Sequence, residues 1–332
     1  MQRLILGSRW LLLCAVTGLL FLAPGAKGDD GPPPSPCEFT DGFYKKFGLD
    51  LGDAGRTHRF AIFTYGAGTS STSRFTALDV SATSSTTLFG YQIMGDIGLA
   101  GAYSNLTVSG YGSVSGDRYV RTTSTETKVG PNATIAGTLY SSSSIDSAAI
   151  NAIAALKNVS NTAAGFAGSS GSPTNINMVG GSTTISNNPF GGKYVMNLSN
   201  LVMSNGATLT LNGVSGSAFV INVAGNFNLN SSARIMLTGG LTTSDVLFNV
   251  RGSSGTFSIT GNSLFTGTLL AYNSASSVQR TLTVSDSNTL VRGQIIANKV
   301  VVNGGGKVRK PPKLSCDSAG DGDEKEREKE RD

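Results

Sequence analysis

Acid–base catalysis would need carboxylates or a histidine brought together, and this sequence holds few of either. A glycan-cleaving site uses two or three carboxylates, or a carboxylate and a base, on one face. The only histidine is His58, and a lone exposed imidazole is more often incidental than catalytic. Between residues 59 and 306 the acids are spread along the chain: Asp79, Asp96, Asp117, Glu126, Asp146, Asp245 and Asp286. We therefore expect no enzyme and no catalytic residues, although folding could bring Asp245 and Asp286 together.

Metal and cofactor chemistry lacks its usual motifs. No His, Cys and carboxylate residues occur at the spacing of a metal site. Glycine is abundant, but no Gly-rich loop precedes a helix as a phosphate-binding loop does. We expect no metal and no cofactor.

The basic residues are scattered along the sequence and give a net charge of +5. In the body of the chain the arginines are Arg74, Arg118, Arg121, Arg234, Arg251, Arg280 and Arg292. A nucleic-acid face would need clustered Lys and Arg with interleaved aromatics, so we expect no nucleic-acid partner. A positive charge is compatible with weak attraction to an anionic polysaccharide or a cell surface.

Hydroxyl side chains offer a different chemistry, which is surface binding. Thr-x-Thr pairs occur at Thr208 and Thr210 and at Thr281 and Thr283. In a strand both members of such a pair lie on one face, where a flat Thr array could order water to match a plane of ice. The pairs do not recur at every repeat, and alternating Thr is common on solvated strands. These four residues are candidates for binding either ice or an extracellular polymer.

The elements that must position these residues are short alternating strands. In residues 217–302, runs such as Phe219, Ile221 and Val223 alternate with other residues and are separated by turns of Gly, Asn and Ser. The octet 264–271 recurs as 290–297, a spacing of 26 residues that fits one turn of a β-solenoid. The alternative is two similar strands of a sandwich. We favour the solenoid.

Part of this pattern resembles known families. Residues 218–225, 246–250, 267–271 and 293–297 are similar to the choice-of-anchor A family of bacterial surface and secreted proteins. They are similar, less closely, to the ice-binding β-solenoid family. The resemblance covers roughly residues 59–302, and Tyr272 departs from the Pro that choice-of-anchor A members usually carry there. The resemblance implies a β-solenoid with an extracellular, non-catalytic role, and it names no ligand.

One helix interrupts the strands. Ile145, Ala149, Ile153 and Leu156 fall at helical spacing, and Ser144 can cap the first turn, which predicts a helix of about three turns. In the ice-binding family a single helix lies along the solenoid and returns the chain to its other end. This helix either does the same or packs elsewhere on the sheet.

The N-terminus predicts export. Arg3 and Arg9 precede an apolar run over residues 10–22, and small residues follow at 26 and 28, so residues 1–28 read as a signal peptide cleaved after Gly28. Cys14 lies inside the apolar run, which favours removal with the signal over lipid attachment. No second apolar segment of spanning length follows. We expect a secreted or cell-surface protein with no transmembrane segment after signal removal.

The remaining regions divide the chain further. Residues 29–58 form a Pro-rich spacer or cap, 59–306 the solenoid domain, and 307–332 a charged tail too poor in apolar residues to order itself. Cys37 and Cys316 remain after signal removal and suggest a disulfide in a secreted chain. In a simple solenoid the two ends are far apart, so this pairing would need a return segment such as the helix.

These observations predict an all-β fold, a β-solenoid with one α-helix packed along it. The function we expect is a secreted or cell-surface structural or adhesive module that presents a Ser/Thr/Asn-rich face to a cell wall, matrix or glycan. The alternative is an antifreeze-type protein that binds ice through a flat Thr-rich face. The expected partner is accordingly an extracellular polymer, a cell-surface component or ice.

Overall fold

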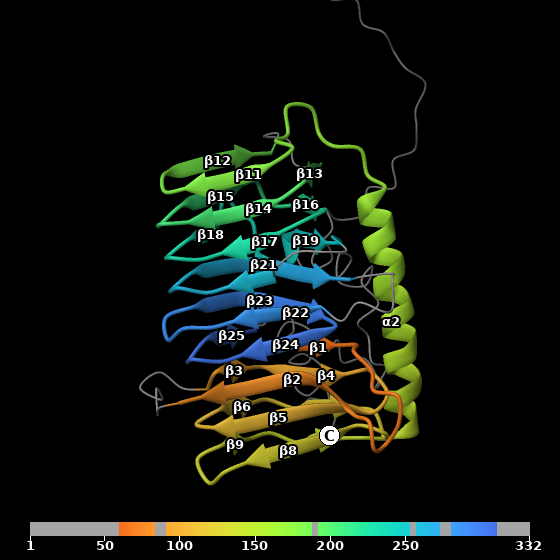
Figure 1. Ribbon diagram of the computed structural model, residues 1–332. Coiled ribbons are helices and arrows are strands. Elements are labelled where there is room, and N and C mark those ends of the chain that lie inside the picture. Colours follow the sequence, from red (N-terminus) through yellow and green to blue (C-terminus); the bar gives the residue numbers. More distant parts are fainter. Residues whose placement is uncertain (1–59, 84–90, 188–191, 253–256, 273–279, 311–332) are drawn as a thin grey trace, which may run out of the picture. The chain divides into compact units, whose positions relative to one another are not determined.

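The computed structural model describes residues 60–83, 91–187, 192–252, 257–272 and 280–310. They all lie in one compact unit, Ser35–Asp332. Within this unit parallel strands wind into a β-solenoid with one helix along it, as predicted (Figure 1). The predicted signal peptide and spacer lie outside the described residues, as do Cys37 and Cys316.

Nine parallel strands form one wall of the solenoid, which we call the nine-stranded sheet. Their spatial order is β11 (Ile176–Val179), β14 (Leu201–Ser204), β17 (Phe227–Leu229), β20 (Phe257–Ile259), β22 (Thr281–Val284), β24 (Lys299–Val302), β2 (Phe75–Ala82), β5 (Ser104–Gly110) and β8 (Thr125–Val129).

A sixteen-stranded sheet bends to form the other two walls. The helix face comprises β13 (Gly192–Leu198), β16 (Ser217–Val223), β19 (Val246–Val250), the second halves of β21 (Leu264–Ala271) and β23 (Leu290–Ala297), β1 (Phe60–Thr64), β4 (Asp96–Leu99), β7 (Arg118–Val120) and β10 (Leu139–Tyr140). The distal face comprises β12 (Ser182–Ser186), β15 (Thr208–Asn212), β18 (Arg234–Thr238), the first halves of β21 and β23, β25 (Lys307–Arg309), β3 (Ile93–Met94), β6 (Ser113–Ser115) and β9 (Thr134–Ile135).

The repeat of 26 residues sets the register between β21 and β23, as predicted. Leu264 pairs with Leu290, and the match continues to Ala271 and Ala297. Both strands bend between the distal face and the helix face at stacked glycines, Gly267 and Gly293, which have φ values of 141° and 139°. A side chain at Gly293 would place its Cβ 1.9 Å from the carbonyl oxygen of Gly267, so only glycine fits this corner.

Strand β25 corrects one predicted boundary. We expected the regular pattern to end at Gly306 and the charged tail to begin at Lys307. Instead residues 307–309 pair with β23 and β3, because Val308 alternates with two basic residues and fills the core. The stack therefore extends three residues into the predicted tail.

Helix α2 (Ser143–Ala164) is the return segment. It follows β10 and runs beside the stack to the end that holds β11 and β12 (Figure 1). Its 22 residues exceed the predicted three turns, and its N-cap is Ser142, whose hydroxyl accepts from the Ile145 amide at 3.3 Å, in place of the predicted Ser144. The apolar pattern ends early because a polar residue, Ser160, occupies a buried position of the last turns.

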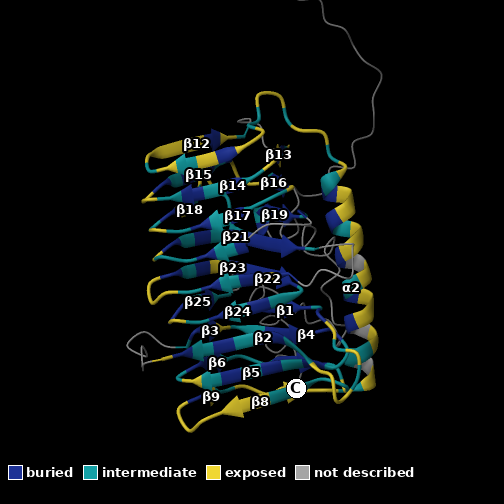
Figure 2. Cartoon of the chain, in the orientation of Figure 1, coloured by how far each residue is buried: buried dark blue, intermediate teal, exposed yellow. Residues whose placement is uncertain are grey.

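Two kinds of contact fix α2 on the sheet. Leu156, Ala149 and Ala152 are buried against apolar residues of the helix face, while the opposite side of the helix is exposed (Figure 2). Near its C-terminus, Ser160 Oγ donates to Asn249 Oδ1 at 2.7 Å, and Asn249 Nδ2 donates to the Asn222 Oδ1 at 2.8 Å. Buried amides satisfied in this way fix the position of the helix as well as stabilising it.

The stacking order differs from the order along the chain. Strand β1 pairs with β23, β2 with β24 and β3 with β25, so the N-terminal turns continue the stack where the C-terminal turns end. As a result the two ends of the described chain meet: Phe60 is aligned with Asp96, and the Lys310 Nζ lies 3.1 Å from an Asp96 carboxylate oxygen.

The edge strand β8, at one end of the stack, carries charged side chains at core positions. Glu126 and Lys128 occupy the positions of β8 that align with the buried Leu106 and Val108 of β5. Glu126 accepts a hydrogen bond from Arg118 Nε at 2.7 Å. Inward-pointing charges at a sheet edge oppose pairing with another chain, so this end is protected from edge-to-edge association.

Candidate binding faces

The nine-stranded sheet presents one continuous column of outward side chains, which we call the central column. In β22, for example, Leu282 and Val284 point into the core and Thr283 points outward. At a strand spacing of about 4.8 Å the column is about 38 Å long. The strand register aligns its nine members in this order: Asn177, Val202, Asn228, Ser258, Thr283, Val301, Asp79, Thr107 and Thr127.

Side-chain hydrogen bonds run both along and between the strands of this face. Ser258 Oγ donates to Asn228 Oδ1 at 3.1 Å, and Asn105 Nδ2 donates to Thr107 Oγ1 at 3.0 Å. Thr125 Oγ1 in turn donates to Asn105 Oδ1 at 3.1 Å. These bonds hold short polar side chains in fixed positions, so the face is pre-organised for contacts with a ligand.

The predicted threonines lie on two different walls. Thr281 and Thr283 are on the nine-stranded sheet, whereas Thr208 and Thr210 are in β15 on the distal face. The structure therefore does not bring the two pairs together. Each pair has its own polar neighbours instead.

The neighbours of the β15 pair were not predicted from the sequence. Ser182 and Thr184 of β12 align with Thr208 and Thr210, which makes a small hydroxyl zone at one end of the distal face. The signal was present, because 182 and 208 are separated by the same 26 residues as the repeated octets. The signal is weak because β12 has a single buried residue, Ile185, and so lacks the apolar alternation that marks a strand.

The two aspartates named above as a possible catalytic pair have separate structural roles. Asp245 accepts hydrogen bonds from the amide and hydroxyl of Thr242 at 2.7 Å, in the short 3-10 helix η2 (Thr243–Asp245) before β19. Asp286 accepts from the Gly261 amide in the turn before β23. They stand at the two opposite edges of the distal face, so they do not form a carboxylate pair. Within the described ranges no group of three His, Cys, Asp or Glu could hold a metal ion.

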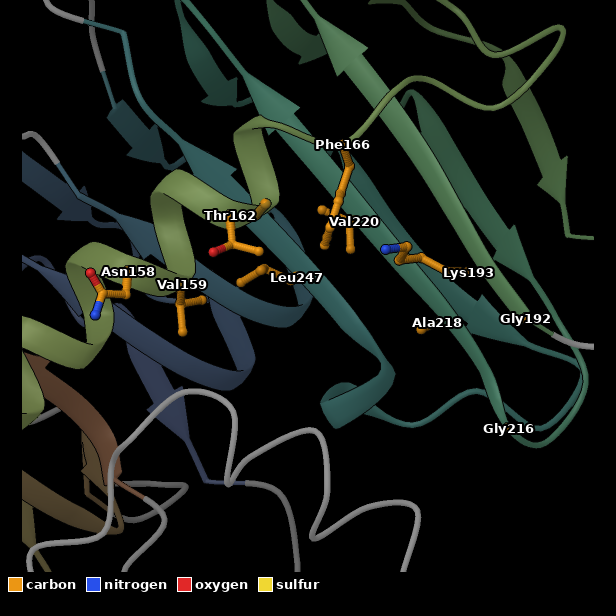
Figure 3. Close-up of a pocket in the computed structure, with 11 residues that line it drawn as sticks. Asn158, Val159, Thr162, Phe166, Gly192, Lys193, Gly216, Ala218, Val220 and Leu247 are labelled. Carbon is orange, nitrogen blue, oxygen red and sulfur yellow. The ribbon is translucent and has the colours of Figure 1, made fainter.

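A pocket of about 560 Å³ lies between α2 and the strands β13, β16 and β19 (Figure 3). Its wall is mostly apolar and includes Val159, Phe166 and Leu247. Among the described lining residues the one charged group is Lys193, whose Nζ lies 3.1 Å from the centre of the Phe166 ring. The described lining residues include no carboxylate or imidazole and so form no acid–base pair.

The fold also gathers basic residues that are scattered in the sequence. Arg234, Arg292, Lys307 and Arg309 all point outward from the distal face. Lys307 shows the effect of this grouping, because burial and the positive charge of Arg309 lower the pKa of its ammonium group. These four basic residues are thus scattered along the sequence, as predicted, but the fold groups them on one face.

The sequence model of one protein family, described as "Putative Ice-binding-like adhesive domain", matches residues 58–309. The chain belongs to this family. The match spans both the nine-stranded sheet and the distal face. The resemblance to choice-of-anchor A proteins is to another family, and it stays a prediction. A search of the curated proteins returns no match.

Several solved structures are similar to this member of the ice-binding-like adhesive family. A glycosylated ice-binding protein from an Arctic yeast is 19% identical with a TM-score of 0.48, over 77% of this chain and 94% of its own. An ice-binding protein from the Antarctic ascomycete Antarctomyces psychrotrophicus is 17% identical with a TM-score of 0.43, over 79% and 97%. One from an Antarctic bacterium of the Flavobacteriaceae is 20% identical with a TM-score of 0.46, over 76% and 45%.

No helix in the described parts of the chain combines the length and apolar character needed to cross a bilayer.

Proposed function

We propose that this protein is an extracellular adhesive module whose nine-stranded sheet binds a polymer of a cell wall, matrix or glycan. The observation that carries the proposal is the central column, in which nine aligned positions hold short, mostly uncharged side chains. Membership of a family described as adhesive supports the same function. The proposal assigns no catalytic role, and it includes the predicted secretion.

The regular spacing of polar groups in the central column suits a long, repetitive ligand. Asn228, Ser258 and Thr283 stand on successive strands and offer amide and hydroxyl groups at one spacing. Each contact is weak, but a polymer that meets many of them gains affinity from multivalency. Short side chains on hydrogen-bonded strands also lose little conformational entropy when a ligand binds.

An array of uncharged glycans and matrix proteins tests this proposal. The secreted protein is expected to bind at least one polymer, and Thr107→Tyr combined with Thr283→Tyr should abolish that binding by covering the central column. Tyrosine is favoured on strands, so both replacements should fold. The matched control is Thr184→Tyr with Thr210→Tyr on the distal face, which should bind like the natural protein. Equal binding by both double variants would contradict the assignment of the nine-stranded sheet.

Ice binding is the second candidate, because the family description includes it. Ser258 and Thr283 are adjacent in the central column, as are Thr107 and Thr127, so hydroxyl groups form two short runs. Thermal hysteresis and ice shaping measured on the purified protein separate the two candidates. Hysteresis that Thr107→Tyr with Thr283→Tyr removes would favour ice over a polymer.

Secretion is proposed as part of this function and has its own test. N-terminal sequencing of the protein recovered from the medium should begin at Asp29, because the small residues at 26 and 28 suit signal peptidase. A mature N-terminus at Cys14 would indicate lipid attachment instead, and an uncut chain that stays in the cell would contradict export.

A further inference from the structure

Four basic and four apolar side chains share the middle of the distal face, which we call the basic patch. Arg234 and Arg292 are exposed, whereas Lys307 and Arg309 are half-buried. All four point outward, since the alternating residues Ile235, Val291 and Val308 are fully buried. The apolar members on the same surface are Met94, Met236, Leu264 and Leu290, each half-buried or exposed.

The strand register places like charges directly beside one another. Arg292 of β23 aligns with Arg309 of β25, so their backbones are about 4.8 Å apart. Lys307 lies two residues before Arg309 on the same strand and face. Like charges opposite each other on neighbouring strands are destabilising, so this arrangement does not serve the stability of the sheet.

No Asp or Glu lies beside the three arginines on the described strands of the basic patch. The outward positions of β18, β21, β23, β25 and β3 hold no Asp or Glu. The acids at the edges are engaged elsewhere: Asp96 pairs with Lys310, and Asp286 accepts from the Gly261 amide. Within the described residues Arg309 Nε is buried without a hydrogen-bond partner. The three arginines of the basic patch therefore have no acid beside them on these described strands.

We propose that the basic patch binds a linear anionic polysaccharide. Guanidinium groups bind carboxylate or sulfate groups through paired hydrogen bonds, and Arg234, Arg292 and Arg309 supply them over three strand steps, about 14 Å. Leu264 and Leu290 lie between Arg234 and Lys307 in the strand register and offer apolar surface to the carbon faces of sugar rings. This site is on a different wall from the central column, so it goes beyond the adhesive function proposed above.

The composition of the basic patch argues against two other polyanions. Binding to single-stranded nucleic acid relies on aromatic side chains that stack on bases, and the patch contains none. Insertion into a membrane interface favours Trp, Phe or Leu that project from an amphipathic helix, whereas the leucines here lie half-buried in a sheet. A polymer that lies along the surface fits these side chains better.

The experiment measures binding of the secreted full-length protein to heparin and to hyaluronan, with dextran as the neutral control. Heparin presents sulfate and carboxylate groups, and hyaluronan carboxylate alone. We expect binding to at least one of them that weakens as salt is added. Arg292→Gln with Arg309→Gln should weaken it about tenfold or more, because two charge-assisted contacts are lost.

The matched control is Lys128→Gln with Lys157→Gln, which removes the same net charge from two exposed positions outside the basic patch. It should bind within about twofold of the natural protein if local contacts and not net charge decide affinity. The sheet variant Thr107→Tyr with Thr283→Tyr should also retain polysaccharide binding, which keeps this proposal separate from the adhesive one. Thermal unfolding checks that each variant is folded.

Several results would overturn the proposal. It fails if neither anionic polysaccharide binds, if the arginine variant binds as tightly as the natural protein, or if the lysine control loses as much affinity as the arginine variant. Tighter binding to a DNA duplex or to phosphatidylserine vesicles than to either polysaccharide would assign the basic patch to another class of partner and overturn it as well.

Discussion

At the scale of single residues, a buried amide ladder ties the helix to the sheet. Asn249 is fully buried; its Nδ2 donates to the Ser160 carbonyl oxygen at 2.9 Å and to Asn222 Oδ1 at 2.8 Å. Asn222 in turn donates to Asn197 Oδ1 and to the carbonyl oxygen of Ala163. Loss of one member leaves several buried groups without partners, which is costly in a low-dielectric interior.

Asn249→Ala is therefore expected to lower the free energy of unfolding by about 2–4 kcal/mol. Urea denaturation followed by circular dichroism gives this value. Asn177→Ala is the control, because Asn177 is exposed on the central column and should change stability by less than about 0.5 kcal/mol. Equal effects of the two replacements would show that the ladder does not stabilise the fold.

Glycine at the corner of each turn gives a second prediction at this scale. Gly293→Ala should prevent stable folding or lower the free energy of unfolding by more than about 4 kcal/mol, because the new Cβ would meet the Gly267 carbonyl oxygen.

Gly192→Ala is its control. Gly192 also has a positive φ of 100°, but no atom lies within 4 Å of the added carbon, so only backbone strain of about 1–2 kcal/mol is expected. Soluble yield and thermal unfolding measure both variants. A Gly293→Ala protein as stable as the control would show that the corner can open.

At the scale of elements, α2 stabilises the solenoid through one apolar side. Leu156 is fully buried against the helix face, whereas Ile150 is 51% exposed on the same helix. Leu156→Ala should lower the free energy of unfolding by about 2–5 kcal/mol, since it removes buried carbon and leaves a cavity. Ile150→Ala should have a much smaller effect. Both are compared by urea denaturation, and similar losses would mean that α2 packs on the sheet through another side.

At the scale of the whole described unit, the return helix brings the chain ends together. Phe60 aligns with Asp96, and Lys310 forms an ion pair with the same residue. Phe60 and Lys310, the described residues nearest in sequence to Cys37 and Cys316, thus both lie next to Asp96. This arrangement supports the proposed disulfide, which a solenoid without a return segment would oppose.

The proposed disulfide predicts that the secreted protein has no free thiol when denatured without reductant, because its two cysteines pair. Reduction should then lower the free energy of unfolding by a few kcal/mol, about the value expected for closure of a very long loop. Thiol titration and mass spectrometry of non-reduced peptides test this directly. Two free thiols per chain would disprove the pairing.

Strands, the 26-residue spacing of β21 and β23 and the presence of one helix could all be predicted from the sequence. These features depend on the alternation of neighbouring residues, as in Leu264 to Ala271 and its copy, and alternation is local information. The end of the helix was predicted too early, because Ser160 is polar yet buried through its bond to Asn249. A partner 89 residues away along the chain cannot be found from a local pattern.

The folded structure was needed to find which residues share a surface. It separated Thr208 from Thr283, placed Asp245 and Asp286 at opposite edges, and gathered Arg234, Arg292 and Arg309 into one patch. The cause is the path of the chain, since α2 returns to the far end of the stack and β1 then pairs with β23. In a solenoid, most neighbours on a face are one turn apart along the chain, so a sequence repeat can reveal them. The pairing of β1 with β23 joins segments that are far apart in the sequence, and no repeat reveals that contact.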